Sequence, residues 1–425
     1  MRHDAEQLRQ YALITGNYWA FTLTDGALRM LVVLHFHTLG HSPLAIASLF
    51  LLYEIFGVVT NLVGGYLGAR IGLNRTMNIG LALQVAALAL LAVPNAWLTV
   101  PWVMAAQALS GIAKDLNKMS AKSAIKLLVP SGGDDRGAQL YRWIAALTGS
   151  KNALKGVGFF LGAALLATFG FRGALLGMVS ALLLVWAASV VLLRRDLGKA
   201  KRKPKFRDIL SKSRAVNVLS AARLFLFAAR DVWFVVALPV FLSDALGWGF
   251  WAVGGFLAAW VIGYGAVQTV APYVTGLAAT QKRSTLPDGR TALGWAVALA
   301  GVPAGIAIAL SAGLAPTIAV VGGLALFGLL FAVNSALHSY LIVSYAAEDG
   351  VSLDVGFYYM SNAMGRLAGT VLSGWAFQAF GLGSNGLEAC LWISSACIAA
   401  AAALSVALPR HGPDAQPVAV RDMGD

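Results

Sequence analysis

Charge is scarce in this chain of 425 residues: only 12% of them are Asp, Glu, Lys or Arg, whereas 58% are hydrophobic. A soluble domain carries roughly 25% charged residues, so the composition excludes an ordinary soluble protein. Apolar stretches of about 20 residues, each long enough to cross a bilayer, recur along the whole chain. The sequence therefore predicts an all-α integral membrane protein, embedded in lipid by many crossings.

Cysteine is almost absent, with only Cys390 and Cys397. Their spacing puts them about 10 Å apart along one helix, too far for a disulfide, so we interpret them as packing or lipid-facing residues. His35, His37 and His41 lie close together in the sequence but have no carboxylates beside them, which favours a hydrated loop. We therefore expect no metal site and no cofactor.

Signals for other classes of protein are also missing. The first residues, "MRHDAEQLRQ", contain no small-residue cleavage site, so we expect the first apolar segment to serve as an uncleaved signal anchor. No nucleophile or metal constellation is placed at a membrane face, which speaks against an enzyme. The absence of a soluble output domain speaks against a receptor. The net charge of +13 follows mainly from membrane topology, so we expect no nucleic-acid partner.

The apolar stretches predict twelve membrane-crossing helices. Their expected ranges are 12–37, 43–68, 76–95, 98–119, 140–168, 172–194, 216–244, 250–278, 291–311, 315–343, 354–380 and 386–408.

One polar stretch interrupts this pattern. Residues 194–214 contain ten Lys or Arg residues against Asp196 and Asp208. The positive-inside rule places this linker in the cytoplasm, and the even number of crossings then places both termini there too. The expected organisation is a first six-helix half (1–193), a basic linker (194–215), a second six-helix half (216–408) and a cytoplasmic tail (409–425).

Several charges lie near the predicted membrane surface. Lys122 and Lys126 continue beyond the fourth crossing, and we expect them to snorkel toward the cytoplasmic interface. Glu348, Asp349 and Asp354 give the connection before the eleventh crossing an acidic character. That connection is expected to be solvated, with pairing to the basic linker in one gating state as the alternative.

The most informative feature is the set of cations in the middle of apolar segments. A cation at the bilayer centre costs about 3 kcal/mol on the insertion scale, so eight of them would cost roughly 20 kcal/mol or more. Such residues are tolerable where they face a wet cavity, pair with anions or receive an anionic ligand. The eight are Arg29, Lys114, Lys118, Lys151, Lys155, Arg223, Arg230 and Arg366.

The four lysines form two pairs on consecutive helices. Lys114 and Lys118 share one face of the fourth crossing, and Lys151 and Lys155 share one face of the fifth. Two such pairs repel each other unless an anion lies between them, and each ammonium–anion contact is worth about 4 kcal/mol at 4 Å and an effective dielectric of 20. The lysines therefore predict a site for a small anionic substrate.

The second half supplies arginines. Arg223 and Arg230 are seven residues apart on one face of the seventh crossing, and Arg366 follows Asn362 by one turn. Guanidinium groups suit phosphate, arsenate or carboxylate oxygens, with structural salt bridges as the alternative. His338 in the tenth crossing is a further ligand candidate, with a helix–helix hydrogen bond as the alternative.

Four carboxylates also lie deep in the crossings. Asp25 and Arg29 are spaced to form an ion pair within one helix. Asp115 and Asp231 each directly follow a base, so we expect them to point elsewhere and to pair across helices. Glu54 has no local partner. It is either a proton-coupling site or a buried, hydrogen-bonded carboxyl group.

Six crossings, a basic linker and six more crossings are typical of the major facilitator superfamily. The segment "GGYLGARIGLNRT" (64–76) resembles the loop motif of that superfamily. Ala69 stands where the motif has an aspartate, so a gating role is predicted for Arg70 alone. The matching positions are Gly65, Leu67, Arg70 and Gly72.

Four longer runs resemble the organoarsenical efflux permeases of bacterial arsenic-resistance operons. They are "GNYWAFTLTDGALRMLVVLHFH" (16–37), "GIAKDLNKMSAKSAIKLLVP" (111–130), "LTGSKNALKGVGFFLG" (147–162) and "GFYYMSNAMGRLAGTVLSGW" (356–375). The resemblance extends to about residue 408.

This resemblance implies a substrate and a functional partner. A glyceraldehyde-phosphate dehydrogenase joins arsenate to a triose phosphate, and the permease exports the product, 1-arseno-3-phosphoglycerate, across the bacterial cytoplasmic membrane. An organophosphate or organic-anion exchanger without a role in arsenic resistance is the alternative, because the same basic cavity would serve it.

Overall fold

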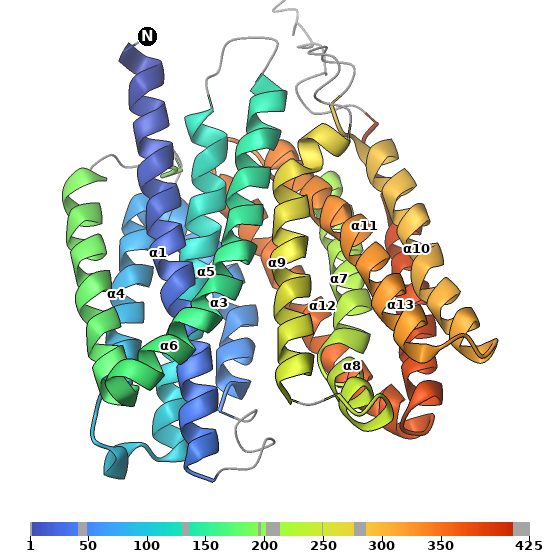
Figure 1. The fold of residues 1–425 in the computed structure, drawn as a ribbon. Coiled ribbons are helices and arrows are strands. Elements are labelled where there is room, and N and C mark those ends of the chain that lie inside the picture. The colour runs from blue at the N-terminus through green and yellow to red at the C-terminus, as the bar shows by residue number, and fades with distance from the viewer. Residues whose placement is uncertain are drawn as a thin grey trace, which may run out of the picture.

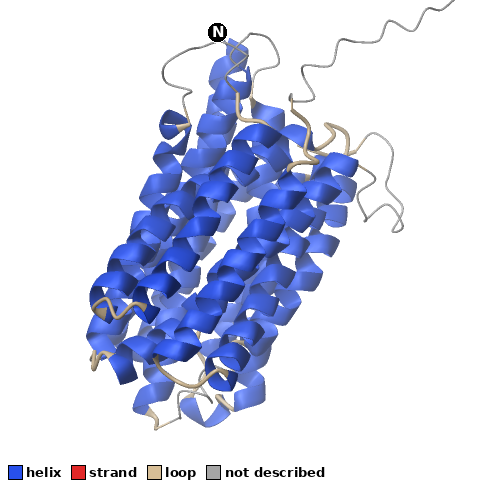
Figure 2. Cartoon of the chain, turned by 90° about the vertical axis from the view of Figure 1, so that its right-hand side faces the viewer, coloured by secondary structure: helices blue, strands red, loops and turns tan. Residues whose placement is uncertain are grey.

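The structure is a computed structural model, in which residues 2–40, 49–129, 136–193, 197–200, 213–248, 250–275 and 286–410 are described. Within these ranges the chain is helical and contains no strand (Figure 2). Most helices run nearly parallel to one another, as expected for a bundle that crosses a membrane. The predicted fold class is confirmed.

The first half of the bundle supplies six crossings from five helices. Helix α6 is much longer than the others because it contains a fold at Gly170, where the backbone adopts a φ of 66° that favours glycine. Its two arms therefore cross in opposite directions. The helices are α1 (Arg2–Thr38), α3 (Leu51–Ile71), α4 (Leu73–Leu91), α5 (Val100–Leu128) and α6 (Arg136–Leu192).

The second half supplies the other six crossings. The predicted helix 216–244 is shorter than expected: α7 ends at Phe234, and α8 and a π-helical turn, Phe241–Ala245, follow it. The helices are α7 (Arg214–Phe234), α8 (Ala237–Val240), α9 (Phe250–Val274), α10 (Gly289–Ser311), α11 (Pro316–Tyr345), α12 (Val351–Ala379) and α13 (Ser384–Ser405).

Helix boundaries differ from the predictions mainly where polar sequence continues a helix. Helix α1 begins ten residues before the predicted start, and α5 continues to Leu128. Six of the described helices are long and apolar enough to span a membrane by length and composition alone. Among the others, α1, α5, α7 and α12 carry the deep charges, which lower their mean hydropathy.

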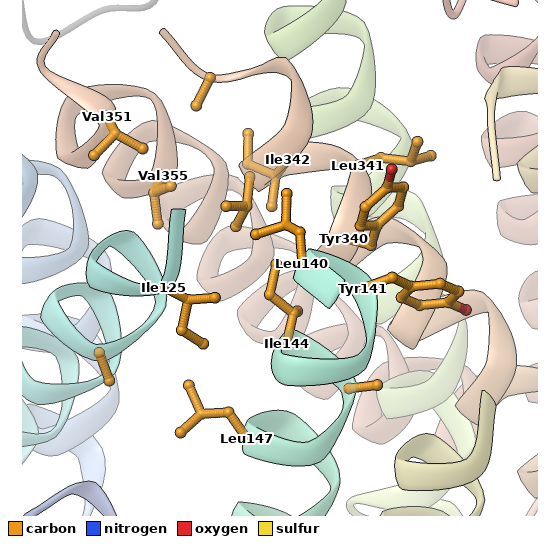
Figure 3. Close-up of a cluster of buried hydrophobic side chains, with 14 of the residues drawn as sticks. Ile125, Leu140, Tyr141, Ile144, Leu147, Tyr340, Leu341, Ile342, Val351 and Val355 are labelled. Atoms are coloured by element: carbon orange, nitrogen blue, oxygen red, sulfur yellow. The ribbon is translucent and has the colours of Figure 1, made fainter. Parts of the chain in front are cut away.

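The two ends of the bundle are packed differently. We call the end that carries the N-terminus and residues 197–200 the linker end (Figure 1). There a single hydrophobic core contains side chains of both halves, including Ile144 and Leu147 of α6 and Leu341 and Val355 of α11 and α12 (Figure 3). Away from that end, each half has its own core. The halves are therefore fused by apolar packing at the linker end.

Close backbone contact and polar bonds add to this closure. A Cβ on Gly65 of α3 would collide with the Ser352 carbonyl of α12, and the Ser352 hydroxyl donates to the Gly65 carbonyl at 2.8 Å. Lys126 does not snorkel: its Nζ donates to the carbonyls of Val343 (2.8 Å), Ser344 (3.0 Å) and Ala346 at the end of α11. It thus stabilises the negative end of that helix dipole.

A surface ion pair also joins the halves at this end. Arg136 of the first half contacts Glu348 of the second at 2.8 Å. The hydrogen bond from Arg136 lowers the pKa of the Glu348 carboxyl below its ordinary value. The acidic connection is therefore bonded to the start of α6, a partner that the sequence analysis did not consider. A pocket of about 240 Å³, lined by Lys126, Arg136, Ser344 and Glu348 among others, lies beside this pair.

Candidate functional site

Close contacts between helices at glycine residues bring the lysines of α6 toward α1 and the second half. A Cβ on Gly26 of α1 would lie 2.8 Å from the backbone oxygen of Lys155, so only glycine permits this approach. On the other side of α6, Asn152 donates to Gln268 of α9 at 2.5 Å. The electrostatic neighbours of Lys155 accordingly include Arg29 and Asp25.

A similar close contact between two helices positions Arg366. Gly369 of α12 packs on the backbone of Ala228 in α7, where a Cβ would lie 2.6 Å from the Ala228 oxygen. This approach places Arg366 Nε 3.1 Å from the Asp231 carboxylate. Arg366 Nη2 also lies 3.7 Å from Glu54 of α3, in the other half.

These close helix contacts assemble a network of deep ion pairs that spans both halves. Each of three carboxylates contacts two cations: Glu54 is 3.4 Å from Arg29, and Asp115 is 2.5 Å from Lys118 and 3.8 Å from Lys114. Asp231 is 2.5 Å from Arg230. We call this set the paired cluster: Arg29, Glu54, Lys114, Asp115, Lys118, Arg230, Asp231 and Arg366.

Two predictions about these carboxylates were wrong. Asp25 does not pair with Arg29; it accepts a hydrogen bond from the Tyr53 hydroxyl at 2.7 Å, and Arg29 contacts Glu54. Asp115 pairs with cations of its own helix rather than across helices. Asp231 does reach across, to Arg366 on α12, and also binds its neighbour Arg230.

The paired cluster is accessible. The side chains of Glu54 and Arg366 are each 36% exposed; Glu54 lies in the first turn of α3, whereas Arg366 lies in the middle of α12. In contrast, Asp115 and Asp231 are 1% exposed. The buried carboxylates therefore anchor the cluster, whereas Glu54 and Arg366 are its partly exposed members.

Lys151 and Lys155 stand apart from this pairing. Among the described residues, neither has a carboxylate within 4.0 Å or a hydrogen-bond partner, and both are partly buried. The electrostatic neighbours of Lys151 are mainly cations, Lys118 and Arg366 among them. The predicted pair of lysines on α6 thus lies beside the paired cluster without a carboxylate in direct contact, and Asp25 is the anion among its electrostatic neighbours.

A second group of donors lies closer to the linker end. Arg223 of α7 donates to the Asn362 side chain at 2.9 Å and to the Ser335 carbonyl at 3.3 Å. Lys122 does not snorkel: it is 3% exposed, and its Nζ lies 3.4 Å from the Ser339 hydroxyl of α11. The sequence did not indicate this role, because Lys122 lies outside the predicted membrane segment.

Two further predicted residues have different surroundings. His338 is 1% exposed, its Nδ1 has no hydrogen-bond partner in the described structure, and Arg223 is its electrostatic neighbour. Arg70 is exposed at the linker end, where it donates to the Tyr66 hydroxyl. The glycines of its motif, rather than Arg70, make the contact with α12.

The fold and the charged interface between its halves define a membrane carrier, and the sequence comparison agrees. The sequence profile of the Major Facilitator Superfamily matches residues 14–287, and the chain belongs to this superfamily. It is a multi-pass membrane transporter. No curated protein matches the sequence.

Solved structures show the same fold at low sequence identity. A bacterial homologue of the iron transporter ferroportin, in an outward-facing state, is 14% identical with a TM-score of 0.69, over 96% of this chain and 99% of that one. The human organic anion transporter MFSD10 is 15% identical with a TM-score of 0.71, over 93% and 99%. The proton:xylose symporter XylE is 15% identical with a TM-score of 0.67, over 93% and 94%.

Proposed function

We propose that this transporter exports an anionic organoarsenical, 1-arseno-3-phosphoglycerate, from the bacterial cytoplasm. The observation that carries the proposal is the pair Lys151 and Lys155, which has no described carboxylate within 4.0 Å, beside the partly exposed Arg366. Buried cations without partners are costly, and an oxyanion between them removes that cost. The resemblance of the four sequence runs to organoarsenical permeases selects arsenic among the possible oxyanions.

In this proposal the substrate reaches the carrier from a functional partner. Glyceraldehyde-phosphate dehydrogenase makes the organoarsenical in the cytoplasm, and the carrier releases it outside. The linker and both termini lie in the cytoplasm, in accordance with the positive-inside rule. The conformation with a packed linker end is then closed toward the cytoplasm. For export, the linker end must open so that the carrier can bind a new substrate molecule from the cytoplasm.

Alternating access follows from the distribution of contacts. The paired cluster includes cations of both halves, and Arg366 contacts carboxylates on both sides of the interface. A substrate oxyanion that competes for Arg29 and Arg366 weakens the Glu54 contact between the halves. Binding would thereby couple to the relative motion of the halves, as in carriers that rock about a central site.

The test is arsenate tolerance in an arsenate-sensitive bacterium that expresses the chain with and without the dehydrogenase. We expect resistance, together with arsenate in the medium, only when both proteins are present. A catalytically inactive dehydrogenase and the Lys151→Ala chain, each at matched membrane abundance, serve as controls. Equal tolerance in all strains would reject the organoarsenical as substrate.

That negative result would favour the alternative, an organophosphate or organic-anion exchanger. Reconstituted vesicles distinguish the two, because exchange of phosphorylated three-carbon acids needs neither arsenate nor the dehydrogenase. Exchange that is lost in the Lys151→Ala chain would keep the basic site and change its ligand.

A further inference from the structure

We infer that the carrier has a second, carboxylate-free oxyanion subsite at the linker-end side of the paired cluster, so that it selects anions with two oxyanion heads. The inference rests on the proposed function for the size of its ligand. We call this set of residues the donor cluster: Lys122, Arg223, Ser335, His338, Ser339, Tyr358 and Tyr359.

The donor cluster combines four helices. Ser335, His338 and Ser339 share one face of α11 by their i, i+3 and i+4 spacing. Tyr358 and Tyr359 come from α12 and stack edge to face, with ring centroids 5.0 Å apart. The rings join the cations: Arg223 of α7 is 5.3 Å from the Tyr358 ring, and Lys122 of α5 is 5.1 Å from the Tyr359 ring. Both halves therefore contribute to the cluster.

Its polar atoms lack partners. The hydroxyls of Tyr358, Tyr359 and Ser335 and the Nδ1 of His338 make no well-formed hydrogen bond in the described structure, although the Ser339 hydroxyl lies close to both tyrosine hydroxyls. All four residues are at most 3% exposed. A buried polar group without a partner costs about 1–3 kcal/mol, so several at one place are rare in a structural core. Hydroxyl groups that converge with two cations are the donors that an oxyanion needs.

The electrostatic surroundings also favour an anion. The neighbours of Lys122 are Arg223, Lys151 and Lys118, all cations. Within the described part of the chain, no carboxylate lies within 4.0 Å of either Lys122 or Arg223. The paired cluster contains its own anions, whereas the donor cluster contains none.

The two clusters are adjacent. Lys118 of the paired cluster lies 4.6 Å from the Tyr359 ring, and Lys122 lies 5.1 Å from the same ring. Since these lysines are four residues apart on α5, their Cα atoms are about 6 Å apart along the helix. Two oxyanions joined by a three-carbon spacer fit this separation: one at the cations of the paired cluster, the other at the donor cluster.

The experiment compares two matched probes that contain no arsenic. Propane-1,3-diol bisphosphate has two heads, and propyl phosphate has one. Binding of each to the full chain in lipid nanodiscs is measured by calorimetry. We expect the bisphosphate to bind at least about tenfold more tightly than the monophosphate, and the double variant Tyr358→Phe/Tyr359→Phe to reduce that ratio about tenfold.

Thermal stability without ligand separates binding from structure. Because the two hydroxyls make no well-formed hydrogen bond, the double variant should unfold at the same temperature as the parent or higher. Tyr11→Phe is the matched control, since the Tyr11 hydroxyl donates to the Trp143 carbonyl at 3.2 Å and neither residue belongs to either cluster. It should leave the ratio unchanged.

Two outcomes would overturn the inference: equal affinity of the parent chain for both probes, or an unchanged ratio in the double variant. Because neither probe contains arsenic, these outcomes are independent of the arsenate-tolerance assay. A high ratio without arsenate resistance would retain the subsite and reject the organoarsenical.

Discussion

The paired cluster and the donor cluster lie side by side, but the cations of the first contact carboxylates and those of the second do not. In the paired cluster, Asp115 and Asp231 are 1% exposed and each contacts two cations. In the donor cluster, Lys122 and Arg223 are both 3% exposed and meet only neutral oxygens and aromatic rings.

This difference separates two tasks. Ion pairs within a membrane keep cations in place without a ligand, and they change partners when the halves move. Cations without an anionic neighbour gain most from an added anion, because nothing in the protein already neutralises them. The paired cluster is therefore suited to coupling the halves, and the donor cluster to holding a ligand.

The largest effect is expected from breaking the paired cluster at Arg366. Arg366→Ala leaves Glu54 with Arg29 and Asp231 with Arg230 as the remaining partner. Loss of one member of a fully buried pair costs about 3–5 kcal/mol, and the 36% exposure of Arg366 and these remaining cations reduce that cost. We expect export to fall at least about a hundredfold and the unfolding temperature to drop. Efflux from vesicles and thermal unfolding measure the two effects. Arg366→Lys should restore part of the stability, because it retains the charge; normal export by Arg366→Ala would reject the coupling role.

The sequence predicted more of the fold than of the site. Periodic apolar stretches and the linker were sufficient for the twelve crossings, because helices in lipid must satisfy their own backbone hydrogen bonds. The deep cations were also evident. Their partners were not, because lateral packing decides them: the local pairing of Asp25 with Arg29 is replaced by Tyr53 and Glu54, both from α3.

The missed residues share a different cause. Lys122 was assigned to the membrane surface because the predicted membrane crossing ended at residue 119, whereas the continuing helix α5, which ends at Leu128, buries it against α11. Tyr358 and Tyr359 carried no signal, since tyrosines in an apolar helix are common. They are distinguished only by buried hydroxyls without a well-formed hydrogen bond and by the cations over their rings, Arg223 over Tyr358 and Lys122 over Tyr359.

Opening the linker end should expose the donor cluster. Gly65→Ala places a methyl group against the Ser352 carbonyl of α12, and such overpacking costs about 1–3 kcal/mol. We expect a shift of about 5- to 150-fold toward the open linker end. The shift is measured by the alkylation rate of a cysteine introduced as Ser344→Cys, at a buried position of the linker-end pocket. Cys390 and Cys397 are replaced in this chain so that only the introduced cysteine reacts. Gly177→Ala, which would meet nothing within 4 Å, should leave the rate unchanged.

Neutralising an unpaired cation should have the opposite effect on stability from Arg366→Ala. Lys151→Gln removes a charge that repels Lys118 and Arg366 and has no described anionic partner. We expect an unfolding temperature that is unchanged or higher, together with about tenfold weaker binding of propane-1,3-diol bisphosphate. Thermal unfolding with and without the bisphosphate tests both parts. A large loss of stability without ligand would show that Lys151 has a structural partner.

The smallest effect is expected at the surface pair of the linker end. Glu348 is 63% exposed, so its contact with Arg136 is worth about 0–1 kcal/mol, and Glu348→Gln should raise alkylation of Ser344→Cys at most about fivefold. Arg136 lowers the pKa of Glu348. The ion pair therefore stabilises the closed linker end fully at any pH above the ordinary pKa of a carboxyl group, and this stabilisation is lost only as the pH falls through the lowered pKa. Alkylation, corrected for the reactivity of the reagent, should therefore be flat from about pH 5 to 8. Glu388→Gln is the control, because it makes the same substitution at the opposite end of the bundle, where the carboxylate accepts a hydrogen bond from Ser311; it should not change alkylation. A pH-dependent rise of alkylation in the parent chain that Glu348→Gln abolishes would contradict the prediction. It would mean that the Glu348 carboxyl titrates between about pH 5 and 8 and controls the opening of the linker end.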